Sequence, residues 1–406
     1  MNPSEVLRIV DAIHRDKRIA KEIVFVGIEA AIATAVRRQY GDEAVVKIQV
    51  NRETGEITGS CNDEPIATSE LAERIGAQNA KQVMIQKIRE AERDAIFDEN
   101  YSQINQLVSG SVDKIEGSNV IISLPGVVAI LPRSERIPGE SFRIGDRIRA
   151  VVTDVVKKGN RVNVMLSRIR PSFVQKLFEQ EIPEIQDAII ETKGVSREPG
   201  CRTKIAVYSS DQRVDCVGAC IGMRGNRIKN ITDELNNERI DVVPWNADLQ
   251  IYIQEALKPA IIEEVILCSM LGRAIVLVKQ DNRSLAIGRR GQNVRLASRL
   301  VGWDIEIMTR EDLEDLLEKA VEGYMLIEGI TNDIADRLVG EGFLSFDDLS
   351  IIEPDDLVQI GEITMDQAVS IIQQAEEFAQ KEEDFKLQPR ANEDENKSQE
   401  ENVEDE

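Results

Sequence analysis

The sequence contains only one histidine, His14, among 406 residues. This leaves almost no material for a histidine-based catalytic triad or for a metal site with several histidine ligands. The single position sits in a helical pattern near the start of the chain, where Val6, Ile9 and Val10 recur at helical spacing. We therefore expect neither a catalytic site of that kind nor a bound cofactor.

Cysteine is also scarce: there are five residues and no C-x-x-C pair. An odd number without such a pair is typical of a reducing compartment rather than of a disulfide framework. We expect buried free thiols and no metal. A zinc site at Cys201, Cys216 and Cys220 stays open as an alternative, although a structural zinc ion takes four ligands. The five cysteines are Cys61, Cys201, Cys216, Cys220 and Cys268.

Aromatic residues make up 4% of the chain, so surfaces for stacking nucleic-acid bases should be few. Long hydrophobic runs are missing as well. The longest, residues 23–36, contains Glu29 and is shorter than the ~20 residues of a membrane span. No signal-peptide pattern precedes Ser4. We expect a cytoplasmic protein with no membrane contact.

The net charge of −23 is distributed very unevenly. Lys/Arg and Asp/Glu number 14 and 16 in residues 1–97, 30 and 27 in residues 98–310, and 6 and 30 in residues 311–406. The acidity therefore lies in the C-terminal part, and the middle of the chain can face phosphates.

The chain is long enough for three or four domains of ~100–200 residues. Residues 1–100 predict an N-terminal α/β domain with two helices and a hairpin. A long polar linker helix is expected over 69–100, and its narrow apolar stripe is typical of a helix that bridges two domains. Residues 107–170 contain five short, turn-punctuated strands, which predict a five-stranded OB-type β-barrel.

An internal repeat follows the barrel. Residues 221–229 align with residues 287–295, 66 positions later, and each copy has a Gly-x-x-Gly motif. The flanking patterns repeat in the order helix, strand, strand, helix, helix, strand. We therefore expect two domains of identical αββααβ topology at residues 171–245 and 246–310.

The repeated Gly-x-x-Gly motif suits phosphate binding, because glycines let a backbone approach closely and the next helix presents unpaired N–H groups. Such a module grips about four nucleotides of single-stranded RNA. An ordinary helix–helix turn is the alternative for one copy, and duplication argues against it. The candidate RNA-binding residues are Gly222, Met223, Arg224, Gly225, Arg227 and Lys229 in the first copy and Gly288, Arg289, Arg290, Gly291, Gln292 and Arg295 in the second; Ile221, Ile228, Ile287 and Val294 are candidates for an apolar groove.

Several segments of the chain resemble the NusA family of transcription termination/antitermination factors. They are residues 131–135, 215–225 and 284–295, together with residues 80–90, which resemble that family's linker helix. The resemblance covers about residues 4–310. It implies tandem bacterial-type K-homology (KH) domains, an S-one-type OB barrel, and an N-terminal domain that docks on RNA polymerase while the other domains hold emerging transcript. Other antitermination factors are further partners that it suggests.

The barrel departs from the general S-one pattern in its RNA-binding face. No aromatic residue lies between Gly110 and Glu135, and Pro132 stands roughly where the pattern has a histidine. We expect an electrostatic contribution at most, with plain solvated charges as the alternative. The barrel candidates are Arg133, Arg147, Lys157, Lys158 and Arg161.

The acidic C-terminal part divides into two segments. Residues 320–380 predict a helix-hairpin-helix domain with its turn at 326–330, and its negative charge favours protein docking or masking of the basic domains over nucleic-acid binding. A capping domain without a partner is the alternative. Residues 381–406 contain almost nothing apolar and should be disordered.

Together these observations predict a monomeric α+β multidomain protein without enzymatic activity. Its expected function is that of a transcription elongation factor that binds RNA polymerase and nascent single-stranded RNA and modulates pausing, termination and antitermination. The alternative is an RNA-binding translation or ribosome-assembly factor. An RNA-degrading enzyme that uses the same modules would need a catalytic core larger than residues 1–97.

Overall fold

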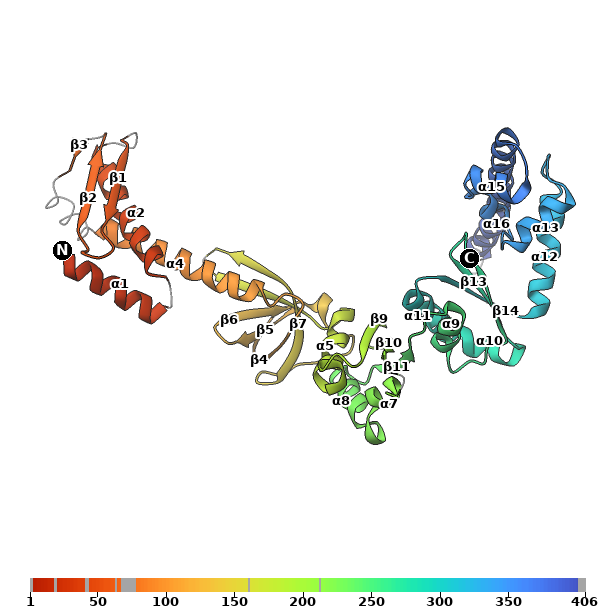
Figure 1. Cartoon of the computed structure of the whole chain (residues 1–406), viewed down its shortest axis with the longest axis horizontal. Helices are drawn as coiled ribbons and strands as arrows, with labels where there is room; N and C mark the ends of the chain where they lie inside the picture. The colour runs from red at the N-terminus through yellow and green to blue at the C-terminus, as the bar shows by residue number, and fades with distance from the viewer. Residues whose placement is uncertain are drawn as a thin grey trace. The chain divides into compact units, whose positions relative to one another are not determined.

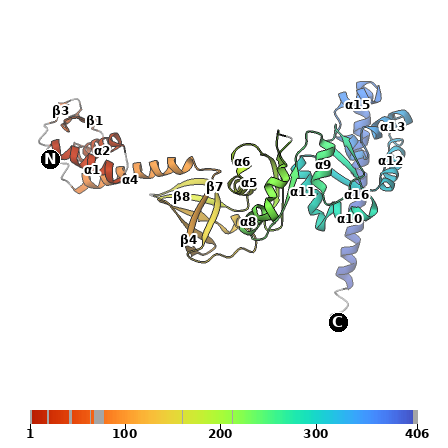
Figure 2. The ribbon, with the colours of Figure 1, turned by 60° about the horizontal axis from the view of Figure 1, so that its bottom comes forward.

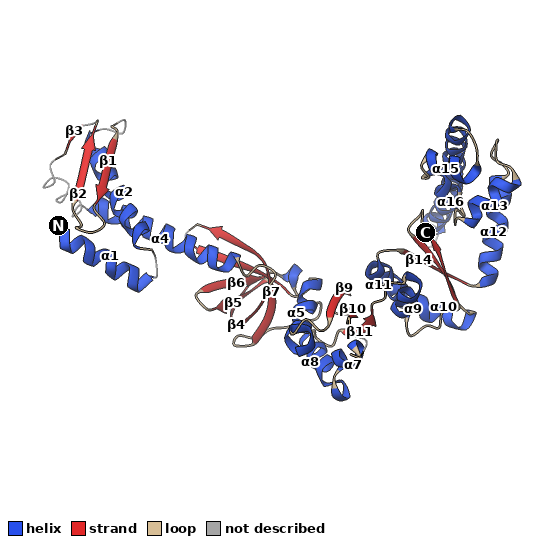
Figure 3. Cartoon of the chain, viewed as in Figure 1, coloured by secondary structure: helices blue, strands red, loops and turns tan. Residues whose placement is uncertain are grey.

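The computed structural model (Figure 1) describes residues 3–17, 20–40, 44–62, 64–66, 78–159, 161–211 and 213–400. Contacts divide the chain into two compact units, Met1–Gln180 and Glu181–Glu406. Figure 3 shows that both units mix helices with strands, as an α+β protein requires.

The first unit begins with two helices and a small antiparallel sheet. Its hairpin turns at Asn51, whose side-chain oxygen accepts hydrogen bonds from two following backbone N–H groups. The predicted linker helix is present from Gln78, and residues 69–77 of that prediction lie outside the described part. The elements are α1 (Pro3–Lys17), α2 (Lys21–Tyr40), β1 (Val46–Val50), β2 (Ile57–Cys61), β3 (Glu64–Pro65) and α4 (Gln78–Tyr101).

The second part of this unit is a closed five-stranded barrel, which confirms the predicted architecture. Its strands follow the order β4-β5-β6-β8-β7, and buried side chains such as Val120, Ile122 and Val164 form the core of the barrel. The strands are β4 (Leu107–Glu116), β5 (Asn119–Leu124), β6 (Val127–Leu131), β7 (Arg147–Lys158) and β8 (Arg161–Ser167).

The repeat folds as predicted into two αββααβ domains with one three-stranded sheet each, ordered β11-β10-β9 and β12-β13-β14. In both sheets the central strand pairs antiparallel with one neighbour and parallel with the other. The first domain comprises α5 (Pro171–Glu181), α6 (Pro183–Gln186), β9 (Glu191–Glu198), β10 (Arg202–Tyr208), α7 (Cys216–Ile221), α8 (Asn226–Glu234) and β11 (Arg239–Pro244). The second comprises α9 (Leu249–Leu257), β12 (Glu264–Cys268), β13 (Arg273–Leu277), α10 (Gln280–Ile287), α11 (Gln292–Val301) and β14 (Asp304–Met308).

The two KH domains share a hydrophobic core. Ala206 and Val243, from the sheet of the first domain, belong to the same buried cluster as Tyr252, Ala274 and other residues of the second. A common core makes relative motion of the two domains costly, because separating them would expose apolar surface to water.

In the described part of the chain, five helices follow the second KH domain, and their apolar residues form one buried cluster with the outer face of its sheet. Side chains alternate along β13, so Ala274 and Val276 face the domain's own helices while Ile275 and Leu277 join the core of the C-terminal helices. These helices are α12 (Arg310–Tyr324), α13 (Asn332–Gly340), α14 (Phe346–Ser350), α15 (Pro354–Gly361) and α16 (Met365–Glu400).

The last helix extends beyond the helical core of the C-terminal part. Helix α16 runs from Met365 to Glu400 (Figure 2). The composition of residues 381–406 predicts disorder, and this stays a prediction. The helical core that packs on the KH sheet ends at Ala379. Of the helices in the described ranges, none has the length and apolar character needed to cross a membrane.

Candidate nucleic-acid interface

The first glycine of each Gly-x-x-Gly loop is required by its conformation and by its surroundings. Gly222 and Gly288 have φ values of 74° and 75°. A Cβ at Gly222 would lie 2.7 Å from Cγ of Arg227, and one at Gly288 would lie 2.8 Å from Cβ of Asn293. Only glycine lets the next helix pack this closely against the loop.

The two loops have the same backbone conformation. Arg224 and Arg290, the third residues, have φ values of 55° and 54°, and the closing glycines Gly225 and Gly291 are also left-handed. This series of left-handed residues turns the chain sharply between the paired helices. The sequence repeat is therefore also a structural repeat.

Four cations of the loops are free to meet an anion. Arg224, Lys229, Arg289 and Arg290 are exposed, and among the described residues none of these four side chains has an acidic partner. Met223, at the tip of the first loop, is 85% exposed. Free guanidinium groups on an exposed glycine turn are well placed to bind phosphate oxygens.

Arg227 has a structural contact that the sequence did not reveal. Its Nη1 donates hydrogen bonds to the carbonyl oxygen of Ala219 at 2.7 Å and to Oε2 of Glu184 at 2.8 Å. The equivalent residue of the second domain, Asn293, is buried and donates to the carbonyl oxygens of Leu257 and Ala286. Both side chains brace the helix before the loop, so Arg227 is a weaker RNA candidate than Arg224.

Two candidate RNA-binding residues of the second copy, Gln292 and Arg295, already form hydrogen bonds with an acidic residue of the first KH domain. Glu198 accepts hydrogen bonds from Nε2 of Gln292 and from Nε of Arg295, each at 2.7 Å. Burial alone would raise the pKa of Glu198, but these two donors and the nearby Arg299 outweigh it and lower the pKa. Although no carboxylate occurs in residues 283–299, the fold supplies one from β9.

We expect Glu198→Gln to tighten binding of single-stranded RNA several-fold. The change removes a negative charge beside the second loop and frees Arg295, whose contact with a carboxylate competes with a phosphate contact. Filter binding of the full chain measures the effect. Arg295→Gln should then weaken RNA binding more in the Glu198→Gln background than in the unmodified chain. Equal losses of RNA affinity in both backgrounds would show that Glu198 does not compete with RNA for Arg295.

The predicted apolar groove is only partly open. Ile221 is 38% exposed, whereas Ile228, Ile287 and Val294 are half-buried. Leu285 is 51% exposed on the helix before the second loop, a position that the sequence comparison passed over. An apolar surface for bases is therefore available on the helices that enter the two loops, at Ile221 and Leu285.

The barrel candidates lie at different ends of the barrel. Lys157, Lys158 and Arg161 surround the β7–β8 turn, whereas Arg147 begins the twelve-residue strand β7 and Arg133 follows β6. Lys157 is engaged, since its Nζ lies 2.7 Å from Oδ1 of Asp94 and over the ring of Phe97.

Linker helix α4 adds two arginines that sequence reasoning missed. Arg89 and Arg93 line a cleft of about 500 Å³ together with Arg161 and the apolar residues Val127 and Val128 of the barrel. The narrow apolar stripe of α4 indicated a helix that bridges two domains. It did not show which arginines of this helix face the barrel. The cleft carries three arginines and one acid, Glu92.

The three cysteines that sequence analysis left open as zinc ligands differ in exposure: Cys201 is exposed, Cys216 partly exposed and Cys220 buried. No group of three or more histidine, cysteine or acidic side chains in the described part of the chain could hold a metal ion. Burial raises the pKa of Cys216, and it raises that of Cys220 to about 12, so both remain protonated at neutral pH. The expectation of buried thiols fails at Cys201, which is exposed at the β9–β10 turn.

Two KH folds in tandem behind an OB-type barrel define a class of multidomain RNA-binding proteins. Family models assign residues 5–70 to the NusA N-terminal domain, 168–245 to the NusA-like first KH domain and 249–315 to the NusA-like second KH domain. The chain belongs to the NusA family.

Curated relatives agree with this assignment. The chain is 39% identical to the transcription termination/antitermination protein NusA of Rickettsia conorii, over 76% of this chain and 68% of the relative. It is 36% identical to that of Rickettsia prowazekii, over 90% and 80%, and 35% identical to that of Bacillus subtilis, over 77% and 93%.

Proposed function

We propose that the chain is a transcription termination/antitermination factor that grips nascent single-stranded RNA with its two Gly-x-x-Gly loops. The observation that carries the proposal is the duplicated left-handed turn, which exposes Arg224, Arg289 and Arg290 without acidic partners in the described structure. Two such modules held by one core can grip neighbouring stretches of one strand.

The barrel contributes charge in this proposal. Arg161 lines one cleft with Arg89 and Arg93, and Lys158 pairs with Arg161 across β7 and β8. The absence of aromatic residues on β5 and β6 leaves electrostatic contacts as the role of these cations. The chain acts by binding, as a monomer in the cytoplasm, and carries out no reaction of its own.

RNA polymerase is the protein partner of the proposal, because the named relatives act in transcription termination and antitermination. The domain formed by residues 1–100 is the proposed docking element, and other antitermination factors are further partners. Affinity capture with the tagged full chain from extract should recover RNA polymerase. Recovery of ribosomal subunits without polymerase would favour a ribosome-assembly function and contradict the proposal.

Binding of single-stranded RNA should weaken steeply with salt. Each phosphate contact contributes a slope of about −0.7 in log K against log salt, so the four free loop cations predict a total near −3. Fluorescence anisotropy of the full chain over a range of potassium chloride concentrations measures this slope. A salt-independent affinity would contradict phosphate binding by these residues.

A further inference from the structure

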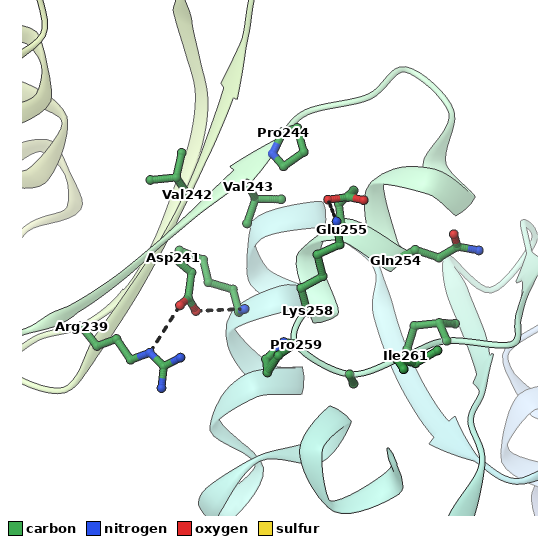
Figure 4. A pocket seen from close by; sticks show the side chains of 13 residues that line it. Arg239, Asp241, Val242, Val243, Pro244, Gln254, Glu255, Lys258, Pro259 and Ile261 are labelled. Carbon is green, nitrogen blue, oxygen red and sulfur yellow. Dashed lines mark hydrogen bonds and ion pairs between the residues drawn. The ribbon is translucent and has the colours of Figure 1, made fainter. Parts of the chain in front are cut away.

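A second concave surface lies between the two KH domains, away from both loops. It is a cleft of about 630 Å³ with one wall from β11 and the other from the end of α9 and residues 258–262 (Figure 4). Lys204 and Asp241 face it from the same side of the sheet as Ala206 and Val243, which pack against the second KH domain. No residue of either Gly-x-x-Gly loop lines it.

Positive charge exceeds negative charge on the β11 wall of this cleft. Asp241 is shared by three cations: Nε of Arg202 lies 2.6 Å and Nζ of Lys204 3.2 Å from its Oδ2, and Nε of Arg239 lies 3.6 Å from its Oδ1. One carboxylate therefore balances three positive charges. Across the cleft, Lys258 and Glu255 form a pair at 2.6 Å and add no net charge.

The geometry points to a phosphate-binding site in this cleft. Arg239 is 67% exposed and Lys258 64%, so both can contact a ligand directly, whereas Lys204 lies beneath with a side chain that is 1% exposed. A dianion neutralises the two charges that Asp241 leaves uncompensated, and a planar guanidinium binds phosphate oxygens in pairs. The phosphate belongs either to an RNA strand or to a free nucleotide or pyrophosphate.

The burial of Lys204 supports a ligand-binding role, because it is unfavourable for the protein alone. Removal from water lowers the pKa of Lys204 from 10.5 to about 8, against the attraction of Asp241 and with the repulsion of Arg202 and Arg239. Below pH 8 the folded chain holds this charge at a cost. Between about pH 8 and 10.5 the unfolded chain binds more protons at this group, so the cost disappears as the pH rises.

Lys204→Met should therefore keep the fold. It retains the aliphatic volume and leaves Asp241 paired with Arg202 and Arg239, so we expect a melting temperature at least equal to that of the unmodified chain at pH 7. The difference between the two proteins should shrink as the pH approaches 10.5. Arg239→Gln, at an exposed position, provides a second variant whose folding is not in question.

Isothermal titration of the full chain with pyrophosphate tests the site. We expect binding by the unmodified chain and at least about tenfold weaker binding by Arg239→Gln, which loses a direct charged hydrogen bond to the ligand. Lys204→Met should also bind more weakly, because it removes one of the positive charges beneath the site. The matched control is Arg213→Gln, which changes an exposed arginine of the same domain that pairs with Asp211. No binding by the unmodified chain, or equal binding by all four proteins, would overturn the inference.

Single-stranded RNA provides the second arm and identifies the source of the phosphate. If an RNA strand occupies the cleft, Arg239→Gln weakens RNA binding and pyrophosphate competes with RNA. If the ligand is a free phosphate compound, RNA affinity stays unchanged while pyrophosphate binding is lost in the variant. The inference does not depend on the loops, because loop variants should lose RNA and still bind pyrophosphate.

Discussion

Arg289→Asp combined with Arg290→Asp is expected to weaken single-stranded RNA binding at least about 100-fold. Each arginine is exposed and lacks an acidic partner, so each is available for a charged hydrogen bond of about 1.5–3 kcal/mol to a phosphate, and the aspartates add repulsion. The slope of log K against log salt should become shallower by about 1.4, corresponding to two lost contacts at ~0.7 each. Filter binding at several salt concentrations measures both quantities.

The substitution should leave the fold intact, which makes the result interpretable. Arg290 has a φ of 54°, and aspartate tolerates this left-handed region better than most residues. Circular dichroism and the melting temperature should therefore match the unmodified chain. Arg213→Asp is the matched control for a charge change on a KH surface, and an equal loss of RNA binding by that variant would show that only overall charge matters.

The equivalent change in the first loop, Met223→Asp with Arg224→Asp, tests whether RNA binding uses one loop or both. Because both loops are supported by a common core, a strand that reaches both should bind much more tightly than either loop alone allows. We expect the chain with both substitutions in the first loop to bind RNA with a smaller slope of log K against log salt, because only the cations outside that loop remain to contact phosphates. Unchanged affinity in both loop variants would refute the assignment of the loops.

The repeat allowed the loops to be predicted from sequence because their geometry is local. Two glycines, the residues between them and the start of the following helix determine the turn, and all of them lie within nine consecutive positions. The barrel was also predictable, since each strand shows its own alternation of apolar residues. Strand boundaries are less predictable: Ala188 adopts a left-handed turn with a φ of 56°, and β9 begins only at Glu191.

Contacts between distant residues could not be predicted in this way. Glu198 lies 97 positions before Arg295, and Glu184 lies 43 positions before Arg227, so a count of charges along the chain shows those arginines as unpaired. The cleft beside β11 likewise depends on Lys204, Asp241 and Lys258, which only the folded sheet and the neighbouring domain bring together. Charge patterns locate a basic region, whereas the fold decides which of its charges remain free.

The acidic helices at the C-terminus are the clearest case of this distinction. Their charge predicted protein docking or masking of the basic domains, and two of their acids pair with arginines of the second KH domain, Asp348 with Arg273 and Asp312 with Arg283. The buried core of the contact is apolar. Ile275, Leu277 and Met308 of the sheet are buried against residues such as Tyr324 and Leu338. This contact covers the sheet face opposite the helices that carry the second loop, so in the described structure these helices act as part of the folded KH domain.

Deleting residues 311–406 is therefore expected to destabilise the second KH domain strongly. The deletion exposes Ile275, Leu277 and Met308, each of which contributes about 1.5–3 kcal/mol through burial. It also removes Asp348, whose carboxylate accepts hydrogen bonds from both terminal nitrogens of Arg273 at 3.0 and 2.6 Å. A lower melting temperature and binding of an apolar dye measure the loss.

A shorter deletion separates packing from charge. Removing only residues 383–406 takes away many acidic groups but leaves the helical core, which ends at Ala379. We expect this variant to melt like the full chain. If the tail alone masked the loops, it would bind RNA more tightly with unchanged stability, whereas the longer deletion should lose stability whether or not masking occurs. If the chain without residues 311–406 melted like the full chain, the apolar contact between the C-terminal helices and the sheet of the second KH domain would have no role in stability.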